Sequence, residues 1–231
     1  MRTTFEEQLN NLHLRFSEMG MMASEAIMKS VKAYVDHDKA LAKEVIKNDH
    51  MLNKREMDLE KESFEMIALQ QPVTSDLRMI VTVLKASSDL ERMGDHAVSI
   101  AQETIRVKGE TRIPEIEKLI ADMGDMADSI VEDSLEAYLK RDSKMAEEVA
   151  NRDIKVHYLS AKINKMCITD MQKNSDNVLS GSSYMLVSSY LERAGDYATN
   201  ICEWVVYLNT GHVVELNQKH IADENYSDEI K

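Results

Sequence analysis

The chain has 231 residues, enough for one large domain or two ordinary domains with a sizeable core. Its formal net charge of −13 repels polyanions, so nucleic acid is not an expected partner. The low counts of 7 Gly and 2 Pro, with 5% aromatic residues, disfavour sheets and their turns and favour long helices.

Three helices are predicted for the first half of the chain. The first covers about residues 5–34, and Asp38 suits the N-cap of a second helix that runs to about residue 70. Pro72 marks a break, and a third helix continues from there to about residue 107. Gly109 and Pro114 then separate this half from the rest of the chain.

The second half repeats the first. Residues 19–23 (MGMMA) recur as residues 123–127 (MGDMA) at an offset of 104 (123 − 19), whereas residues 90–95 (LERMGD) recur as residues 191–196 (LERAGD) at an offset of 101 (191 − 90). The second copy is therefore three residues shorter between its second and third elements (104 − 101), and we expect the deletion in a loop.

In the second copy a helix is predicted to end near Tyr138, a second to begin after an N-cap at Asp142, and a break to fall near Asn174. The last helix runs to about residue 209 and contains residues 180–183 (SGSS), which are weak helix formers and fit a kink, a tight helix contact or a flexible point.

The predicted fold is therefore all-α, with two tandem pseudo-symmetric three-helix bundles made of six long antiparallel helices. The first bundle covers residues 1–109 and the second residues 110–212, and residues 213–231 form a polar C-terminal tail.

Two carboxylates lie on an apolar line of the third predicted helix. With 100° per residue, Leu77, Val81 and Leu84 fall on one line, and Glu91 and Asp95 continue it. Like charges four residues apart repel, so a cation is expected beside them, either Lys or Arg of a neighbouring helix or a metal ion. A solvated acidic patch is the third alternative.

The second copy repeats this pair as Glu192 and Asp196. Gly94 and Gly195 sit inside both motifs, and glycine within a helix costs up to about 1 kcal/mol relative to alanine. Their use there therefore suggests the close approach of a neighbour or a ligand.

With these residues in view, the chain resembles the PhoU family, the accessory proteins of the phosphate-specific transport system. The resemblance covers about residues 5–212 and rests on residues 72–78 (PVTSDLR), residues 90–96 (LERMGDH) and residues 191–197 (LERAGDY). Two three-helix bundles, often in a homodimer, are what this family implies for the fold.

The resemblance also implies metal ions, iron or zinc, on the acidic motifs, while magnesium and manganese are further alternatives for a carboxylate-rich site. The residues that it assigns are Asp49, Asn53, Glu91 and Asp95 in the first copy and Asp153, His157, Glu192 and Asp196 in the second. Asn53 and His157 stand where an all-acidic pattern would have Asp, so the two sites are expected to differ in strength and metal preference. Tyr197 replaces His96, so that position is not a ligand common to both copies.

The function that the resemblance implies is regulation without catalysis. The family links a phosphate ABC transporter to a membrane sensor kinase and represses the phosphate-starvation response when phosphate is plentiful. We expect a cytoplasmic protein that reaches the membrane only through these partners, because the sequence shows no signal peptide, no apolar stretch of 18 residues, and just 2 cysteines.

Two rival functions follow from the same residues. A di-iron carboxylate enzyme would need Glu-x-x-His pairs, and none of the 7 histidines has Glu three residues before it. A helical adaptor whose acidic motifs bind no metal stays open.

Overall fold

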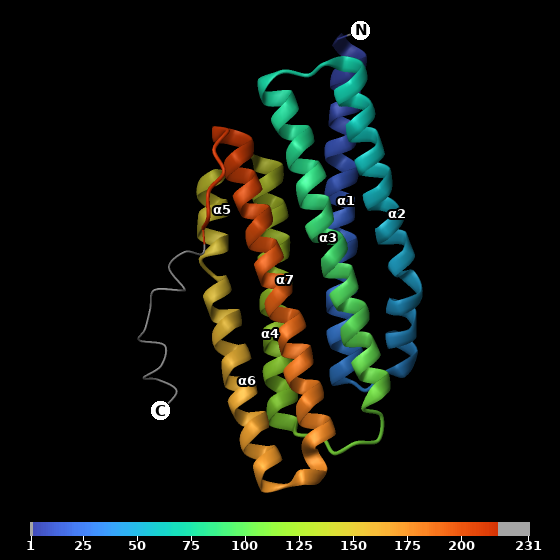
Figure 1. The fold of residues 1–231 in the computed structure, drawn as a ribbon, viewed down its shortest axis with the longest axis vertical. Helices are drawn as coiled ribbons and strands as arrows, with labels where there is room; N and C mark the ends of the chain where they lie inside the picture. Colours follow the sequence, from blue (N-terminus) through green and yellow to red (C-terminus); the bar gives the residue numbers. More distant parts are fainter. Residues whose placement is uncertain (1, 217–231) are drawn as a thin grey trace.

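The computed structural model describes residues 2–216 and is helical throughout, with no strand in that range. The first bundle consists of α1 (Arg2–Val35), α2 (Lys39–Gln70) and α3 (Thr74–Arg106). The second consists of α4 (Pro114–Lys140), α5 (Ser143–Ala150), α6 (Asp153–Lys173) and α7 (Val178–Thr210), with a short 3-10 turn, η1 (Ser175–Asn177), before α7. The predicted fold, two tandem helical bundles, is confirmed (Figure 1).

Both predicted N-caps begin the helices expected of them. The Asp38 carboxylate accepts hydrogen bonds from the backbone N–H groups of Ala40 and Leu41 at 2.9 and 3.0 Å. Asp142 does the same for two N–H groups of α5, both at 3.0 Å. The repeat therefore places the same cap at the same point of each bundle.

The helix predicted after Asp142 is broken into α5 and α6 at residues 151–152. The Asn151 side chain donates to the Glu147 carbonyl at 2.8 Å, a local bond that competes with helix continuation. Arg152 reaches across to α4, where its guanidinium donates to Asp133 at 2.5 Å and to the Ser129 carbonyl at 3.1 Å. The described residues therefore contain seven α-helices where six were predicted, because the second helix of this copy is interrupted.

The three-residue shortening of the second copy falls in the connection before its last helix, as predicted. At the offset of 104, Gln70 at the end of α2 corresponds to Asn174 (70 + 104), directly after α6. At the offset of 101, Thr74 at the start of α3 corresponds to Ser175 (74 + 101), the first residue of η1. Residues 71–73 therefore have no equivalent in the second copy, where η1 takes the place of the first turn of α3.

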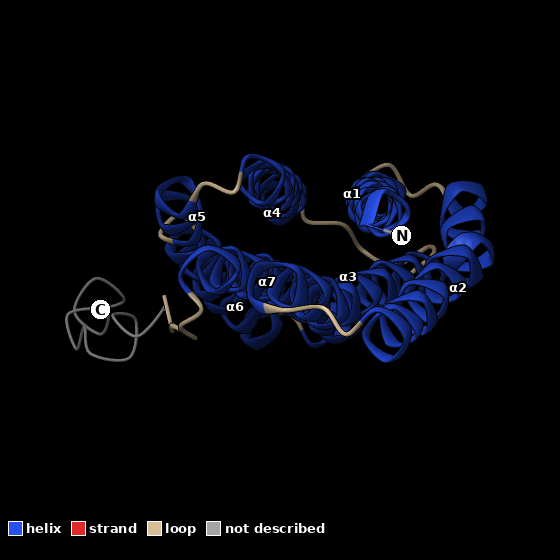
Figure 2. Cartoon of the chain, turned by 90° about the horizontal axis from the view of Figure 1, so that it is seen from above, coloured by secondary structure: helices blue, strands red, loops and turns tan. Residues whose placement is uncertain are grey.

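Two rows of helices are seen along the long axis (Figure 2), with α1 and α4 in one row and α2, α3, α7 and α6 in the other. The bundles meet where α1 contacts α4 and where α3 contacts α7. At the first contact, a Cβ on Gly20 would collide with Leu135 and one on Gly124 with Val31. These two contacts are related by the repeat, so small residues bring the helices together on both sides of a pseudo-twofold axis.

At the second contact the two LER-x-GD motifs lie close to each other. The His96 ring stacks on Tyr197 and on Tyr190, with ring centroids 5.7 and 5.4 Å apart. Asn200 donates to the buried Asp89 carboxylate across the same interface at 3.4 Å. His96 and Tyr197 occupy equivalent positions and pack against each other, which gives them a structural role between the bundles.

The connection between the bundles is held by Arg112. Its guanidinium donates to the Tyr34 and Val35 carbonyls at the end of α1, at 3.4 and 3.3 Å, and forms an ion pair with Glu117. The Tyr184 hydroxyl of α7 donates to the same Glu117 at 2.7 Å. This polar cluster ties the end of the first bundle to the start of the second.

After α7, Val214 and Leu216 pack against the core, and the Leu216 N–H donates to Glu203 at 2.9 Å. The predicted tail of residues 213–231 thus begins as a packed segment, and residues 217–231 lie outside the described residues.

Cys167 and Cys202 are free and buried. Among the helices of residues 2–216, none has an apolar stretch of the length needed to cross a lipid bilayer.

Candidate functional site

In the second copy the four predicted residues meet around His157. Its Nδ1 lies 2.6 Å from Glu192 Oε1, and its Nε2 lies 3.0 Å from Asp153 Oδ2 and 3.3 Å from Asp196 Oδ1. Asp153 and His157 come from α6, one helical turn apart, and the other two come from the α7 motif. The structure therefore brings together one imidazole and three carboxylates that the repeat placed on separate helices.

Gly195 makes this approach possible. A Cβ at Gly195 would overlap the carboxylate of Asp153, which is fully buried in the first turn of α6. Asp153 lies in the first turn of α6, where the helix dipole favours a negative charge. Ser160, one turn beyond His157, donates its hydroxyl to Glu192 at 2.6 Å. The glycine of the motif thus serves a close helix contact, as the sequence suggested.

The charges of this cluster stabilise one another. Hydrogen bonds to Asp153, Asp196 and Glu192 raise the pKa of His157 to about 12, so the imidazole is a cation at neutral pH. The same bond from His157 lowers the pKa of Glu192. The cation that must accompany the acidic pair is, in this copy, a histidine of the chain itself.

The first copy lacks such a cation at the equivalent place. Asn53 donates its side-chain N–H to Asp49 at 3.3 Å, and the Asp49 Oδ1 and Asn53 Oδ1 atoms are buried without a hydrogen-bond partner among the described residues. Burial raises the pKa of Asp49, and repulsion from Asp95 raises it further. Burial and then Asp95 also raise the pKa of Glu91. The four predicted residues are neighbours here, and within the described part of the chain the hydrogen bond from Asn53 to Asp49 is the direct contact between them.

Glu56, which sequence reasoning missed, is a further acidic residue of the first site. Burial raises its pKa, with a smaller contribution from Glu60, and it also raises the pKa of Glu91. Glu56 lies seven residues after Asp49, or two helical turns on the same face, a spacing that could have revealed it. Its equivalent in the second copy is Ser160 (56 + 104), which is uncharged. The first site therefore holds one more carboxylate and no histidine.

The line that carries Glu91 and Asp95 is less buried than predicted. Val81, Leu84 and Glu91 are half-buried and Asp95 is exposed, while the opposite line of α3 is fully buried. That opposite line faces the core through Met79, Val83, Ala86, Leu90, Met93 and Ile100. The carboxylates thus lie at the edge of α3 beside α2, where water reaches part of the cluster.

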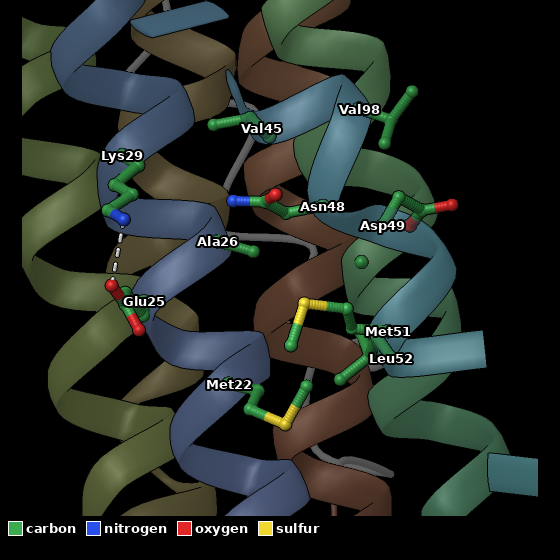
Figure 3. Close-up of a pocket in the computed structure, with 11 residues that line it drawn as sticks. Met22, Glu25, Ala26, Lys29, Val45, Asn48, Asp49, Met51, Leu52 and Val98 are labelled. Carbon is green, nitrogen blue, oxygen red and sulfur yellow. Dashed lines mark ion pairs between the residues drawn. The ribbon is translucent and has the colours of Figure 1, made fainter. Parts of the chain in front are cut away.

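A cavity of about 160 Å³ lies beside the first site, between α1, α2 and α3 (Figure 3). Met22, Met51 and Leu52 form its apolar wall, and Asn48 and Asp49 lie along the α2 side. The equivalent of Asn48 is Arg152 (48 + 104), whose guanidinium crosses to α4 in the second copy. The two copies thus differ in this cavity as well as in their charge.

Comparison with known proteins follows the same division into two copies. A family model described as "PhoU domain" matches residues 16–104 and residues 120–205. The "phosphate-specific transport system accessory protein PhoU homolog" of Clostridium acetobutylicum is 38% identical over 94% of this chain and 99% of its own. The homolog of Streptococcus pneumoniae is 34% identical over 94% of this chain and 100% of its own.

Solved structures give the same result for the fold. The crystal structure of the "phosphate transport system regulatory protein PhoU" from Streptococcus pneumoniae matches with a TM-score of 0.85 and 31% identity, over 91% of this chain and 99% of the other. PhoU from Pseudomonas aeruginosa matches with a TM-score of 0.86 and 29% identity, over 90% and 100%. On the combined evidence of both repeats, the relatives and the fold, this chain belongs to the PhoU family.

Proposed function

We propose that this protein is a non-catalytic regulator of phosphate uptake that couples a phosphate ABC transporter to a membrane sensor kinase and represses the phosphate-starvation response. The observation that carries the proposal is the match of the PhoU domain to both halves of the chain. Relatives named as accessory and regulatory proteins of phosphate transport support it over nearly the whole chain. An acidic surface suits docking onto basic surfaces of partners.

Deletion of the gene tests this function. In phosphate-rich medium, transcription of phosphate-uptake genes should rise in the deletion strain and return to the wild-type level when the intact gene is restored. Unchanged transcription in the deletion strain would contradict the regulatory assignment.

The acidic sites are proposed to hold a metal ion. In the second copy Asp153, His157 and Asp196 each offer a ligand atom, and these atoms lie within 4.8 Å of one another, which fits zinc or iron. The buried acceptor oxygens of Asp49 and Asn53 fit a hard cation such as magnesium or manganese in the first copy. A bound metal would neutralise the carboxylates, a role that the His157 imidazolium also fills.

Elemental analysis of the purified protein separates the metal-binding site from the metal-free adaptor. The wild type should retain metal or bind it on titration, and Asp95→Ala combined with Asp196→Ala should weaken that retention. If neither retention nor titration shows metal, the metal proposal fails and the adaptor role stands.

We further propose a homodimer in the cytoplasm that reaches the membrane only through its partners. The family resemblance supports the dimer, and two buried free thiols are what a reducing compartment permits. Sedimentation velocity measures the first claim, and cell fractionation with and without the transporter measures the second. A monomer at micromolar concentration, or membrane association without the transporter, contradicts them.

A further inference from the structure

An open groove of about 580 Å³ runs along the contact between α1 and α4. Its apolar lining comes from Met21 and Met28 of α1 and from Leu135 and Leu139 of α4. Met21 is 62% exposed and Leu139 is 48% exposed, whereas Met28 is half-buried and Leu135 is a buried core residue. The α1–α4 row has no described helix on its outer side (Figure 2).

The repeat shows that the fold does not need these methionines. The residues equivalent to Met21 and Met28 are Asp125 and Glu132, at the offset of 104 that relates the two copies of this helix. The close approach of α1 and α4 is made instead by the glycine contacts, Gly20 with Leu135 and its repeat-related counterpart. The apolar character of the α1 flank therefore points to contact with another molecule.

Carboxylates surround this apolar strip. Glu25 pairs with Lys29 at 2.8 Å, Asp128 accepts from Ser24 at 2.5 Å, and Glu136 pairs with Lys140. Together with Glu132, four carboxylates line the groove, and no lysine or arginine is among its lining residues. A ligand for this surface should therefore be apolar along its centre and positively charged at its edges.

We propose that the α1–α4 groove binds an amphipathic helix of a partner protein, with Leu or Met on one face and Lys or Arg flanking it. Flexible methionine side chains adapt to such a face, and two neighbouring helices form a trough that accepts a third. The proposal deepens the regulatory function and rests on it for the existence of a protein partner. A second copy of this chain is a poorer occupant, because the acidic edges of two such grooves would repel.

The probe is a fluorescent peptide of about 15 residues with Leu at helical spacing on one face and Lys elsewhere. One control peptide has the same composition in an order without that spacing, and the other has Glu in place of Lys. Fluorescence anisotropy should show saturable binding of the Leu/Lys helix, weaker binding of the scrambled peptide, and none of the Leu/Glu helix. Equal binding of the Leu/Lys and scrambled peptides, or no saturable binding, would overturn the proposal.

Met21→Asp combined with Met28→Glu places the second copy's own residues on α1, so the fold should accommodate them. Affinity for the Leu/Lys helix should fall at least tenfold, although the variant gains two negative charges that attract lysine. Met57→Asp on α2 is the matched control, because Met57 is 66% exposed and outside the groove. An equal loss in the control variant, or no loss in the groove variant, contradicts the proposal.

Transcription in the deletion strain, with and without the groove variant restored, distinguishes a failure of the groove proposal from a failure of the proposed regulatory function. If gene deletion leaves phosphate-uptake transcription unchanged, the regulatory function fails whatever the peptide does. If deletion raises transcription but the Met21→Asp, Met28→Glu variant restores full repression, the groove proposal alone fails. Concentration-dependent self-association of the wild type that the groove variant abolishes would assign the groove to a second copy and overturn the proposed occupant.

Discussion

His157 Nδ1 lies 2.6 Å from Glu192 Oε1, and this contact marks the main chemical difference between the two copies. Asn53 stands at the equivalent position of the first copy, where a neutral amide offers one N–H to Asp49 and no charge. The second copy thus carries its own cation, while the first collects carboxylates with raised pKa values. The first site therefore needs a cation from outside its four predicted residues, whereas the second site already contains one in His157.

Replacing His157 with Gln should destabilise the metal-free protein by about 1–3 kcal/mol at pH 6, because three carboxylates lose their cation. The folded pKa of about 12 lies above the unfolded value of 6.5. The contribution of His157 is therefore complete below pH 6.5 and declines as pH rises toward 12. Urea unfolding at pH 6, 7.5 and 9, with a chelator present, measures the unfolding free energy of both proteins. The difference between wild type and His157→Gln should become smaller as pH rises. A difference that is the same at all three pH values contradicts the positive charge assigned to His157.

Transplanting the second site into the first should stabilise the protein. Asn53→His with Glu56→Ser gives the first copy the residues found at His157 and Ser160, and a new imidazolium would offset the repulsion around Asp49. We expect a gain of about 1–2 kcal/mol at pH 7 over Glu56→Ser alone, measured by urea unfolding. The single Glu56→Ser variant is the control. No gain from adding the histidine would show that the first site cannot orient it.

The two motif glycines should respond differently to alanine. At Gly195 the new methyl group would meet the buried Asp153 carboxylate, which cannot move away without leaving His157, so Gly195→Ala should cost about 1–3 kcal/mol. At Gly94 the nearest atom is the tip of Leu52, a flexible side chain, and the helix propensity of alanine offsets part of the overlap. Thermal unfolding should give Gly195→Ala a lower melting temperature than Gly94→Ala. The reverse order would show that the tighter glycine contact is in the first copy and not in the second.

Asp89→Asn should stabilise the protein at pH 7.5 by about 1–2 kcal/mol. Burial raises the pKa of Asp89 to about 6 from 3.8, so its ionisation costs stability as pH rises through that interval. Asparagine keeps an oxygen for the Asn200 bond and carries no charge. The gain should be present at pH 7.5 and absent at pH 3.5, measured as the difference in unfolding free energy from the wild type. A gain of equal size at both values would assign it to packing.

The sequence alone determined most of the helices and their caps, because these depend on signals within a few residues of each other, and it determined their duplication, because the same motifs recur in order along the chain. Asp38 and Asp142 cap helices through N–H groups two and three residues away, and the LER-x-GD motifs recur in register. Such local patterns need no knowledge of the rest of the chain.

Tertiary structure decided which side chains meet and how deeply they lie. The ion pairs of His157 depend on how α6 is rotated against α7, and the half-exposure of Glu91 depends on where α2 lies beside α3. The break between α5 and α6 lies where Arg152 contacts Asp133 of α4. Contacts between helices are set by the packing of whole faces, which spacing along one helix does not specify.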